Sequence, residues 1–260
     1  MTIGIVIPLK AKSVSREWST VEECLFNTLV SLENQSDKNF QAIVVGHDCP
    51  SYLEDRVSKF SANISFFKFE DKPPPEITAS NTINQDNFEL DRCLKIYKGY
   101  KILLENYSIT KLFSLDADDL VRDDFVRFLI KVDSNTSVLI EKGYVFYKNR
   151  KVVNKINNFS SYCGSSFISS VSFIQKNQAD LDFNSFIFRK VGHVSMKDYL
   201  LENKVKFITP EESLIMYVRD NGENISRPDN ASFLYLIRRT IKLNLKRKFF
   251  AKKILSRFSL

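Results

Sequence analysis

The chain has 260 residues, of which 43% are hydrophobic and 13% aromatic, and this is enough apolar material to bury one large core. The aromatic content excludes a disordered chain, and the low numbers of glycine and proline, seven each, exclude a fibrous or linker-like protein. The four cysteines are widely spaced without a C-x-x-C motif. We therefore expect buried thiols rather than a disulfide framework or a zinc site.

Charge is unevenly distributed along the chain. Lysine and arginine outnumber aspartate and glutamate by 38 to 31, which gives a net charge of +7. Nine of the bases and none of the acids lie in residues 232–260, which leaves 29 bases against 31 acids in the rest. We therefore divide the chain into a globular domain, residues 1–231, and a basic amphipathic helical tail, residues 232–260.

Apolar runs and helical spacings alternate through the first half of the chain. Residues 3–8 form a continuous apolar run that ends at a proline, as buried parallel strands do. The order β-α-β-α-β predicts an α/β fold with a mostly parallel sheet flanked by helices. Further strands are expected at 40–46, 64–69, 112–115, 138–140, 144–147, 152–156, 206–209 and 214–218, and helices at 20–32, near 53–60, at 90–104 and at 195–203.

The fourth strand of this series stops abruptly at three acids, Asp116, Asp118 and Asp119. Loops at the carboxyl ends of strands are where α/β folds bind their ligands. Acids separated by one residue there can share a divalent cation through oxygen ligands and leave positions open for substrate phosphates. The next two acids, Asp123 and Asp124, precede an apolar helical pattern, and we expect them to cap that helix.

The strand that ends at Pro8, the second strand that closes on Asp48 and the D-x-D-D sequence after the fourth strand resemble the GT-A glycosyltransferases, family two in particular. The resemblance covers roughly residues 1–226 and implies a GT-A, Rossmann-like fold. It implies an inverting glycosyltransferase that moves a sugar from a nucleotide-diphosphate sugar, with a UDP-sugar as the expected donor, to a glycan or lipid-linked acceptor hydroxyl. Mn²⁺ or Mg²⁺ is the implied cofactor, because a hard cation neutralises the charge of the departing diphosphate.

The resemblance also implies which residues contact the donor. Pro8 would pack against the nucleotide base, and Asp48 would hold the base or the ribose, with an Asx-turn before Pro50 as the alternative. Asp91 and Lys95 lie one helical turn apart and would supply donor contacts, with Lys95 on phosphate. The alternative is that they form an exposed ion pair.

The D-x-D motif and two later segments complete the implied site. Asp116 would contact the ribose or a metal-bound water, and Asp118 would ligate the cation. Gly164 and Ser165 resemble the small-residue turn that lets the backbone approach the sugar, although an ordinary turn has the same composition. The segment 216–226 resembles the family's closing sequence R-x-H-G-x-N-x-S, with Asn221 at the histidine position. A metal ligand of the family is therefore missing here.

The position of the catalytic base has two candidates. Asp198 matches the acid that deprotonates the acceptor hydroxyl in the family, although Lys197 stands where the family carries glutamate. His193 is one of only two histidines. It could be another base, a third metal ligand that joins Asp116 and Asp118, or a structural residue.

Two other functions compete with the transferase. A sugar-phosphate nucleotidyltransferase would need a glycine-rich phosphate loop after the first strand, and the sequence P-L-K-A-K there contains no glycine. The basic tail also suggests a non-enzymatic nucleic-acid-binding protein. Because the domain before it is slightly acidic, we expect no nucleic-acid partner.

The tail carries an apolar residue at every fourth position, with basic residues beside this stripe, as in helices that lie in a membrane interface. We expect the first half of the stripe to pack on the domain. The six bases between residues 246 and 257 would bind an anionic membrane with about 1 kcal/mol each. No signal peptide or run of roughly 20 apolar residues is present. We therefore expect a cytoplasmic protein, peripheral on the inner face of the cell membrane.

Overall fold

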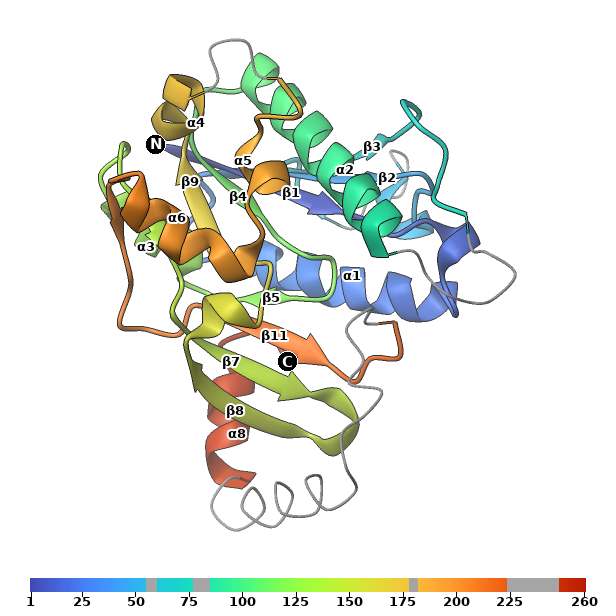
Figure 1. Cartoon of the computed structure of the whole chain (residues 1–260). Helices are drawn as coiled ribbons and strands as arrows, with labels where there is room; N and C mark the ends of the chain where they lie inside the picture. Colours follow the sequence, from blue (N-terminus) through green and yellow to red (C-terminus); the bar gives the residue numbers. More distant parts are fainter. Residues whose placement is uncertain (55–59, 77–84, 178–181, 224–247) are drawn as a thin grey trace.

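Two β-sheets form the framework of the computed structural model, which describes residues 1–54, 60–76, 85–177, 182–223 and 248–260 (Figure 1). The larger sheet has the strand order β10-β6-β9-β4-β1-β2-β3 and the smaller sheet has the order β5-β11-β7-β8. The strands of the larger sheet are β1 (Thr2–Pro8), β2 (Phe40–Gly46), β3 (Ile64–Lys68), β4 (Ile109–Ser114), β6 (Ser137–Leu139), β9 (Phe167–Ser170) and β10 (Phe207–Ile208). Those of the smaller sheet are β5 (Leu120–Val121), β7 (Lys142–Tyr147), β8 (Val152–Asn157) and β11 (Ile215–Arg219).

Strand β1 lies inside the larger sheet, where it pairs in parallel with both β2 and β4. Successive side chains of a strand point to opposite faces. Ile5 accordingly belongs to the core that includes helix α1 (Trp18–Glu33), and Val6 to the core that includes helix α2 (Gln85–Asn106). The two long helices therefore cover opposite faces of the sheet, as Figure 1 shows.

Helix α2 approaches the sheet closely at a glycine. A Cβ atom at Gly99 would lie 2.5 Å from Cγ1 of Val6 and 3.0 Å from Cγ2 of Val45. Cores are packed too densely to absorb such an overlap without a shift of the helix or the strands. This contact sets the position of α2 over β1 and β2.

The predicted strands and long helices are confirmed, and the differences lie in short elements. The helix expected near 53–60 begins as a 3-10 turn, η2 (Ser51–Leu53), and residues 55–59 lie outside the described residues. Strand β9 was not predicted, because its sequence F-I-S-S contains two serines, which favour turns over strands. It lies antiparallel between β4 and β6, and the Ser170 N–H donates to Oγ of Ser137 at 3.0 Å. The shorter helices are α3 (Phe125–Lys131), α4 (Val171–Asn177), α5 (Ile187–Lys190), α6 (Met196–Glu202) and α8 (Lys248–Ser256).

The smaller sheet is continuous with the larger one through a shared core. Strand β5 follows the acidic residues 116–119 directly, so the acidic loop connects β4 of the larger sheet to β5 of the smaller. Strand β11 pairs antiparallel with β5 and parallel with β7. The core beneath α1 extends from Phe113 on β4 to Val121 on β5 and Ile215 on β11. The acidic loop is therefore held at the junction of two sheets that pack as one unit.

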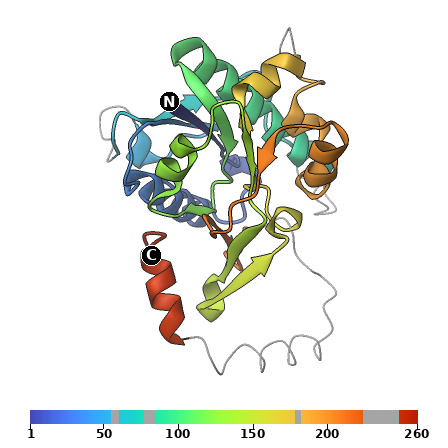
Figure 2. The same ribbon diagram turned by 90° about the vertical axis from the view of Figure 1, so that its left-hand side faces the viewer.

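Helix α8, in the basic tail, packs against the smaller sheet. Ala251, Ile254 and Leu255 contact a cluster that includes Val153 of β8, and Phe258 is only 1% exposed. Both views of the molecule place α8 with β7 and β8, at the end remote from α2 (Figures 1 and 2). Of the apolar stripe predicted to enter a membrane, the described side chains Ile254 and Phe258 therefore pack against protein.

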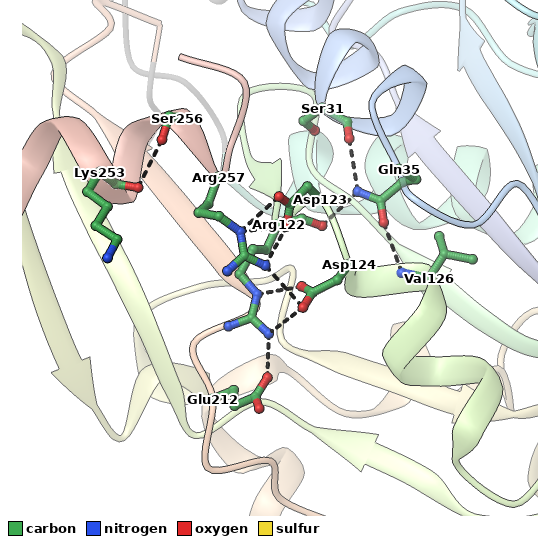
Figure 3. Close-up of polar contacts among 10 residues, drawn as sticks. All are labelled: Ser31, Gln35, Arg122, Asp123, Asp124, Val126, Glu212, Lys253, Ser256 and Arg257. Carbon is green, nitrogen blue, oxygen red and sulfur yellow. Dashed lines mark hydrogen bonds and ion pairs between the residues drawn. The ribbon is translucent and has the colours of Figure 1, made fainter.

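Polar contacts fix the end of the tail to the body (Figure 3). Arg257 Nε donates to both carboxylate oxygens of Asp123 at 2.7 and 2.8 Å, and Arg257 Nη2 lies 3.1 Å from Oδ2 of Asp124. The backbone N–H of Asp123 donates to the Arg257 carbonyl at 2.9 Å. Exposed ion pairs of this kind contribute little to stability, so the buried apolar contacts carry most of the docking.

Asp123 and Asp124 do not cap α3 as the sequence predicted. Asp124 occupies the N-cap position without a side-chain capping bond. Burial raises its pKa, but Arg122 and Arg257 outweigh this effect and hold the pKa of Asp124 below its usual range. The capping bond comes instead from Gln35, whose Oε1 accepts the Val126 N–H at 2.9 Å (Figure 3). Pairing with Arg122 and with Arg257 of the tail thus takes the carboxylates that a local pattern assigned to the helix.

The predicted boundary at residue 231 lies outside the described residues, as does the first half of the tail stripe. In the described ranges, no helix is both long and apolar enough to cross a membrane.

The docking of the tail predicts a stability effect. Replacing Phe258 by alanine removes a fully buried ring, and we expect unfolding free energy to fall by about 3 kcal/mol. Urea denaturation measures the loss. Leu260→Ala is the matched control, because Leu260 is 45% exposed and should cost little. Equal losses in the two variants would mean that the tail is not docked in solution.

Candidate active site

A cavity of about 630 Å³ opens at the carboxyl ends of β1 and β4. Its walls come from the end of β1, the starts of α1 and α2, the acidic loop, the turns that precede β9 and α6, and the segment after β11. Ligands of open α/β sheets bind at this edge. Six acids and three bases line the cavity in the described part of the chain: Asp86, Glu89, Asp91, Asp116, Asp118 and Glu223 against Lys10, Arg92 and Lys95.

The acidic loop is anchored by its one fully buried carboxyl. Asp119 is 0% exposed, and its oxygens accept from the Val218 N–H at 3.3 Å and from Sγ of Cys163 at 3.1 Å. Burial, together with the charges of Asp118 and Asp116, raises the pKa of Asp119 well above its usual range. Asp119 is therefore a structural residue that joins the loop to β11 and to the turn before β9.

Asp118 lines the cavity and is held by an amide. Asn221 Nδ2 donates to its Oδ2 at 2.8 Å, and Oδ1 of Asn221 accepts the Glu223 N–H at 2.9 Å. The second bond orients the amide so that its donor group faces Asp118. Burial and the neighbouring charge of Asp116 raise the pKa of Asp118 to about 6. A cation beside this carboxylate would relieve both effects.

Asp116 is paired with an arginine that the sequence analysis missed. Nε and Nη2 of Arg92 donate to Oδ1 of Asp116 at 2.9 and 2.8 Å. Burial lowers the pKa of Arg92, but the charge of Asp116 outweighs this effect and the pKa is raised. A Cβ atom at Gly164 would lie 2.8 Å from Oδ2 of Asp116 and 3.0 Å from Nη2 of Arg92. A side chain at position 164 would therefore displace the ends of the Asp116 and Arg92 side chains. The feature of the sequence that could have pointed to Arg92 is that it is the only arginine in α2.

Asp91 and Lys95 form an ion pair within the cavity wall rather than on the surface. Lys95 is 1% exposed, and its Nζ donates to Oδ2 of Asp91 at 2.6 Å and to the Leu9 carbonyl at 2.8 Å. Nε2 of His47 lies 3.2 Å from the other oxygen of Asp91. Burial lowers the pKa of Lys95 despite the neighbouring acid. The pair holds the end of β1, next to Pro8, against α2.

Lys10 is a second basic residue in the cavity that the sequence analysis did not assign. Its Nζ contacts Oε2 of Glu223 at 2.6 Å, and Oε1 of Glu223 accepts the Glu17 N–H at 2.8 Å. These contacts connect the segment after β11 to the loop after β1. Only the tertiary structure brings these residues together, because 213 positions separate Lys10 from Glu223.

The two candidates for the catalytic base are placed differently. His193 lines the cavity, and its Nδ1 lies 2.8 Å from the Ser160 carbonyl. A carbonyl can only accept, so Nδ1 carries the proton and Nε2 of the neutral ring has a free lone pair. Asp198 is exposed in the first turn of α6 and does not line the cavity.

Asp48 and Ser165 also lie outside the cavity lining, in contrast to Pro8 and Gly164. Asp48 Oδ2 accepts the Lys12 N–H at 2.7 Å and so holds the loop after β1. Ser165 is fully buried, and its Oγ accepts the Asp116 N–H at 2.9 Å. In this structure both act on the backbone around the site.

Few side chains in the cavity could act as ligands of a metal ion. Within the described ranges, no three His, Cys, Asp or Glu side chains gather closely enough to hold a metal ion. The role of His193 as a third ligand beside Asp116 and Asp118 stays a prediction. Carboxylate oxygens nevertheless suit Mg²⁺ and Mn²⁺, and Mg²⁺ is commonly held by one or two carboxylates with substrate phosphates and water. The site fits a cation that binds together with its substrate.

Comparisons with solved structures identify the fold. The crystal structure of S. aureus TarS 1–349 in complex with UDP-GlcNAc aligns over 99% of this chain and 71% of its own, with a TM-score of 0.53 and 14% identity. A second structure of TarS 1–349 aligns over 84% of this chain and 60% of its own, with a TM-score of 0.50 and 13% identity. TarS is a GT-A-type glycosyltransferase. This chain has a GT-A fold.

The GT-A assignment rests on structure alone. No family model matches the sequence, and no curated protein matches it. In the second alignment the chain spans about 60% of the TarS chain. At 13–14% identity the likeness establishes the GT-A fold, and the activity has to be argued from the cavity itself.

Proposed function

We propose that this protein is an inverting glycosyltransferase that moves a sugar from a nucleotide-diphosphate sugar to an acceptor hydroxyl. The observation that carries the proposal is the pair Asp116 and Asp118, placed in a cavity at the carboxyl ends of parallel strands of a GT-A fold. UDP-GlcNAc is the first donor to test, because TarS was crystallised with it. Neither the nucleotidyltransferase nor the nucleic-acid-binding alternative is favoured.

The charge of the cavity supports a requirement for Mn²⁺ or Mg²⁺. With six acids against three bases in its lining, the cavity would repel a diphosphate that entered alone. The bases are also engaged, since Lys10, Arg92 and Lys95 each contact an acid. Asp118 would hold the cation, with Asp116 beside it. A bound cation supplies the positive charge that the departing diphosphate needs.

We propose His193 as the base in place of Asp198, because His193 lines the cavity. The acceptor oxygen attacks the anomeric carbon as its proton passes to Nε2 of His193, whose Nδ1–H is held by Ser160. The bond from the anomeric carbon to the phosphate oxygen breaks, and the nucleoside diphosphate leaves with the electron pair. Attack opposite the leaving group inverts the anomeric configuration.

Association with an anionic membrane stays a proposal for the tail. Among the described residues of α8, Ile254 and Leu255 pack against protein, and Lys252 and Lys253 are exposed lysines that could meet lipid headgroups. Such a position would favour a glycan or lipid-linked acceptor. A protein with both lysines replaced by glutamate should no longer sediment with phosphatidylserine vesicles at low salt. Retained sedimentation would exclude this face; truncation is unsuitable because it removes Phe258.

Donor turnover should require a divalent cation and Asp118. We expect Asp118→Asn, or EDTA treatment of the wild type, to reduce UDP-GlcNAc hydrolysis by at least about 10²-fold. Asp182→Asn is the control, because Asp182 is exposed and outside the cavity lining. Full activity in EDTA, or in a folded Asp118→Asn protein, would refute the cation proposal.

The base assignment predicts a difference between two variants. His193→Ala should lower transfer by about 10²-fold while UDP binding is kept, because only proton removal is lost. Asp198→Asn should have a small effect. Single-turnover transfer and calorimetric UDP binding separate the two steps. A large loss confined to Asp198→Asn would return the role to Asp198.

A further inference from the structure

Two 3-10 turns form one rim of the cavity. They are η4 (Phe159–Ser161) and η5 (His193–Ser195), which contact each other where the smaller sheet meets α6 (Figure 1). Tyr162 follows η4 directly and Val194 lies within η5, and both line the cavity. The rim therefore includes the proposed base, His193, which lines the cavity together with Tyr162 and Val194.

The rim is braced by polar contacts. Ser160 provides its carbonyl to His193 and its hydroxyl to the carboxylate of Glu141. Glu141 also accepts from Nζ of Lys197 at 3.0 Å. These contacts join η4, η5 and the start of α6, so the rim has a defined shape before any ligand binds. A preformed surface binds without the cost of ordering its side chains.

The apolar side chains on this rim are unusually exposed. Tyr162 is 53% exposed and Val194 is 61% exposed, and neither belongs to an apolar core of the described residues. Large apolar side chains exposed beside a cavity mark binding surfaces. The exposed side chains directly after Val194 are polar, namely Ser195, Lys197 and Asp198, and the next exposed apolar side chain is Leu201, at 58%.

We propose that Tyr162 and Val194 bind the acceptor and that the acceptor presents a pyranose ring to Tyr162. A sugar ring has an apolar face of C–H groups and a polar edge of hydroxyls. The Tyr162 ring can pack against the C–H face of the sugar, because aromatic side chains pack against broad apolar faces. The neighbouring polar residues can form hydrogen bonds with the hydroxyl groups at the edge of the sugar. A lipid chain would need a continuous apolar groove instead. This inference rests on the proposed transferase function.

The test uses saturation-transfer NMR with three probes, the methyl β-glycosides of glucose, galactose and N-acetylglucosamine, in the presence of UDP and Mg²⁺, which is diamagnetic. At least one should bind the wild type, and Tyr162→Ala should raise its Kd by at least about fivefold, the contribution of one aromatic contact. Tyr162→Phe keeps the ring and should bind as the wild type does. Tyr107→Ala is the matched control, since Tyr107 is also exposed, at 43%, but lies outside the cavity lining.

The outcomes separate this inference from the proposed function. If UDP binds by calorimetry but no glycoside shows a Tyr162-dependent signal, the acceptor inference alone is overturned. Binding of n-decyl phosphate in place of the glycosides would overturn it in favour of a lipid surface. If UDP does not bind the wild type at all, the transferase proposal fails, and the acceptor inference fails with it.

Discussion

The buried carboxyl of Asp119 is the contact on which the rest of the site depends. It accepts a hydrogen bond from the backbone of β11 and another from the thiol of Cys163. A buried carboxyl is stable only when its oxygens are satisfied, so both partners must stay in place for the loop to keep its shape. The acidic loop is thereby fixed to the smaller sheet on one side and to the turn before β9 on the other. Asp119 points into the protein and anchors the loop, and this leaves Asp116 and Asp118 to line the cavity.

Around this anchor, two pairs of cavity charges join distant parts of the chain. Arg92 reaches Asp116 from α2, and Glu223 reaches Lys10 from the segment after β11. These pairs fix side chains in place and at the same time remove positive charge that a diphosphate could use. In the proposed function, a substrate anion would then depend on a cation brought to Asp118. The same contacts that order the cavity side chains therefore support the proposed metal-dependent chemistry.

The position of the tail in the fold gives its described part a different role from the one that its composition suggests. By composition it is a basic amphipathic segment, and such segments suit membranes. In the structure its last turns fill a cluster of the smaller sheet with Phe258 and pair Arg257 with Asp123. Because β5 begins immediately after Asp119, this docking also supports the strand that continues from the acidic loop. The segment predicted to be a peripheral attachment is, in its described part, packed into the globular body.

The sequence by itself determined the α/β architecture and the location of the acidic loop. Strand periodicity and the abrupt change from apolar residues to Asp116 are local features, and local patterns specify strands, long helices and the loops at their ends. The acidic pattern also identified Asp118, and the resemblance to GT-A glycosyltransferases pointed to Pro8 and Gly164; all three line the cavity.

The tertiary structure decided which polar residues meet. Arg92 with Asp116, Lys10 with Glu223, and Arg257 with Asp123 are contacts between residues 24, 213 and 134 positions apart, and no local spacing encodes them. It also placed Asp198 on the surface and His193 in the cavity, although only five positions separate the two. The physical reason is that ion pairing and burial depend on distance in space, whereas periodicity records only distance along the chain.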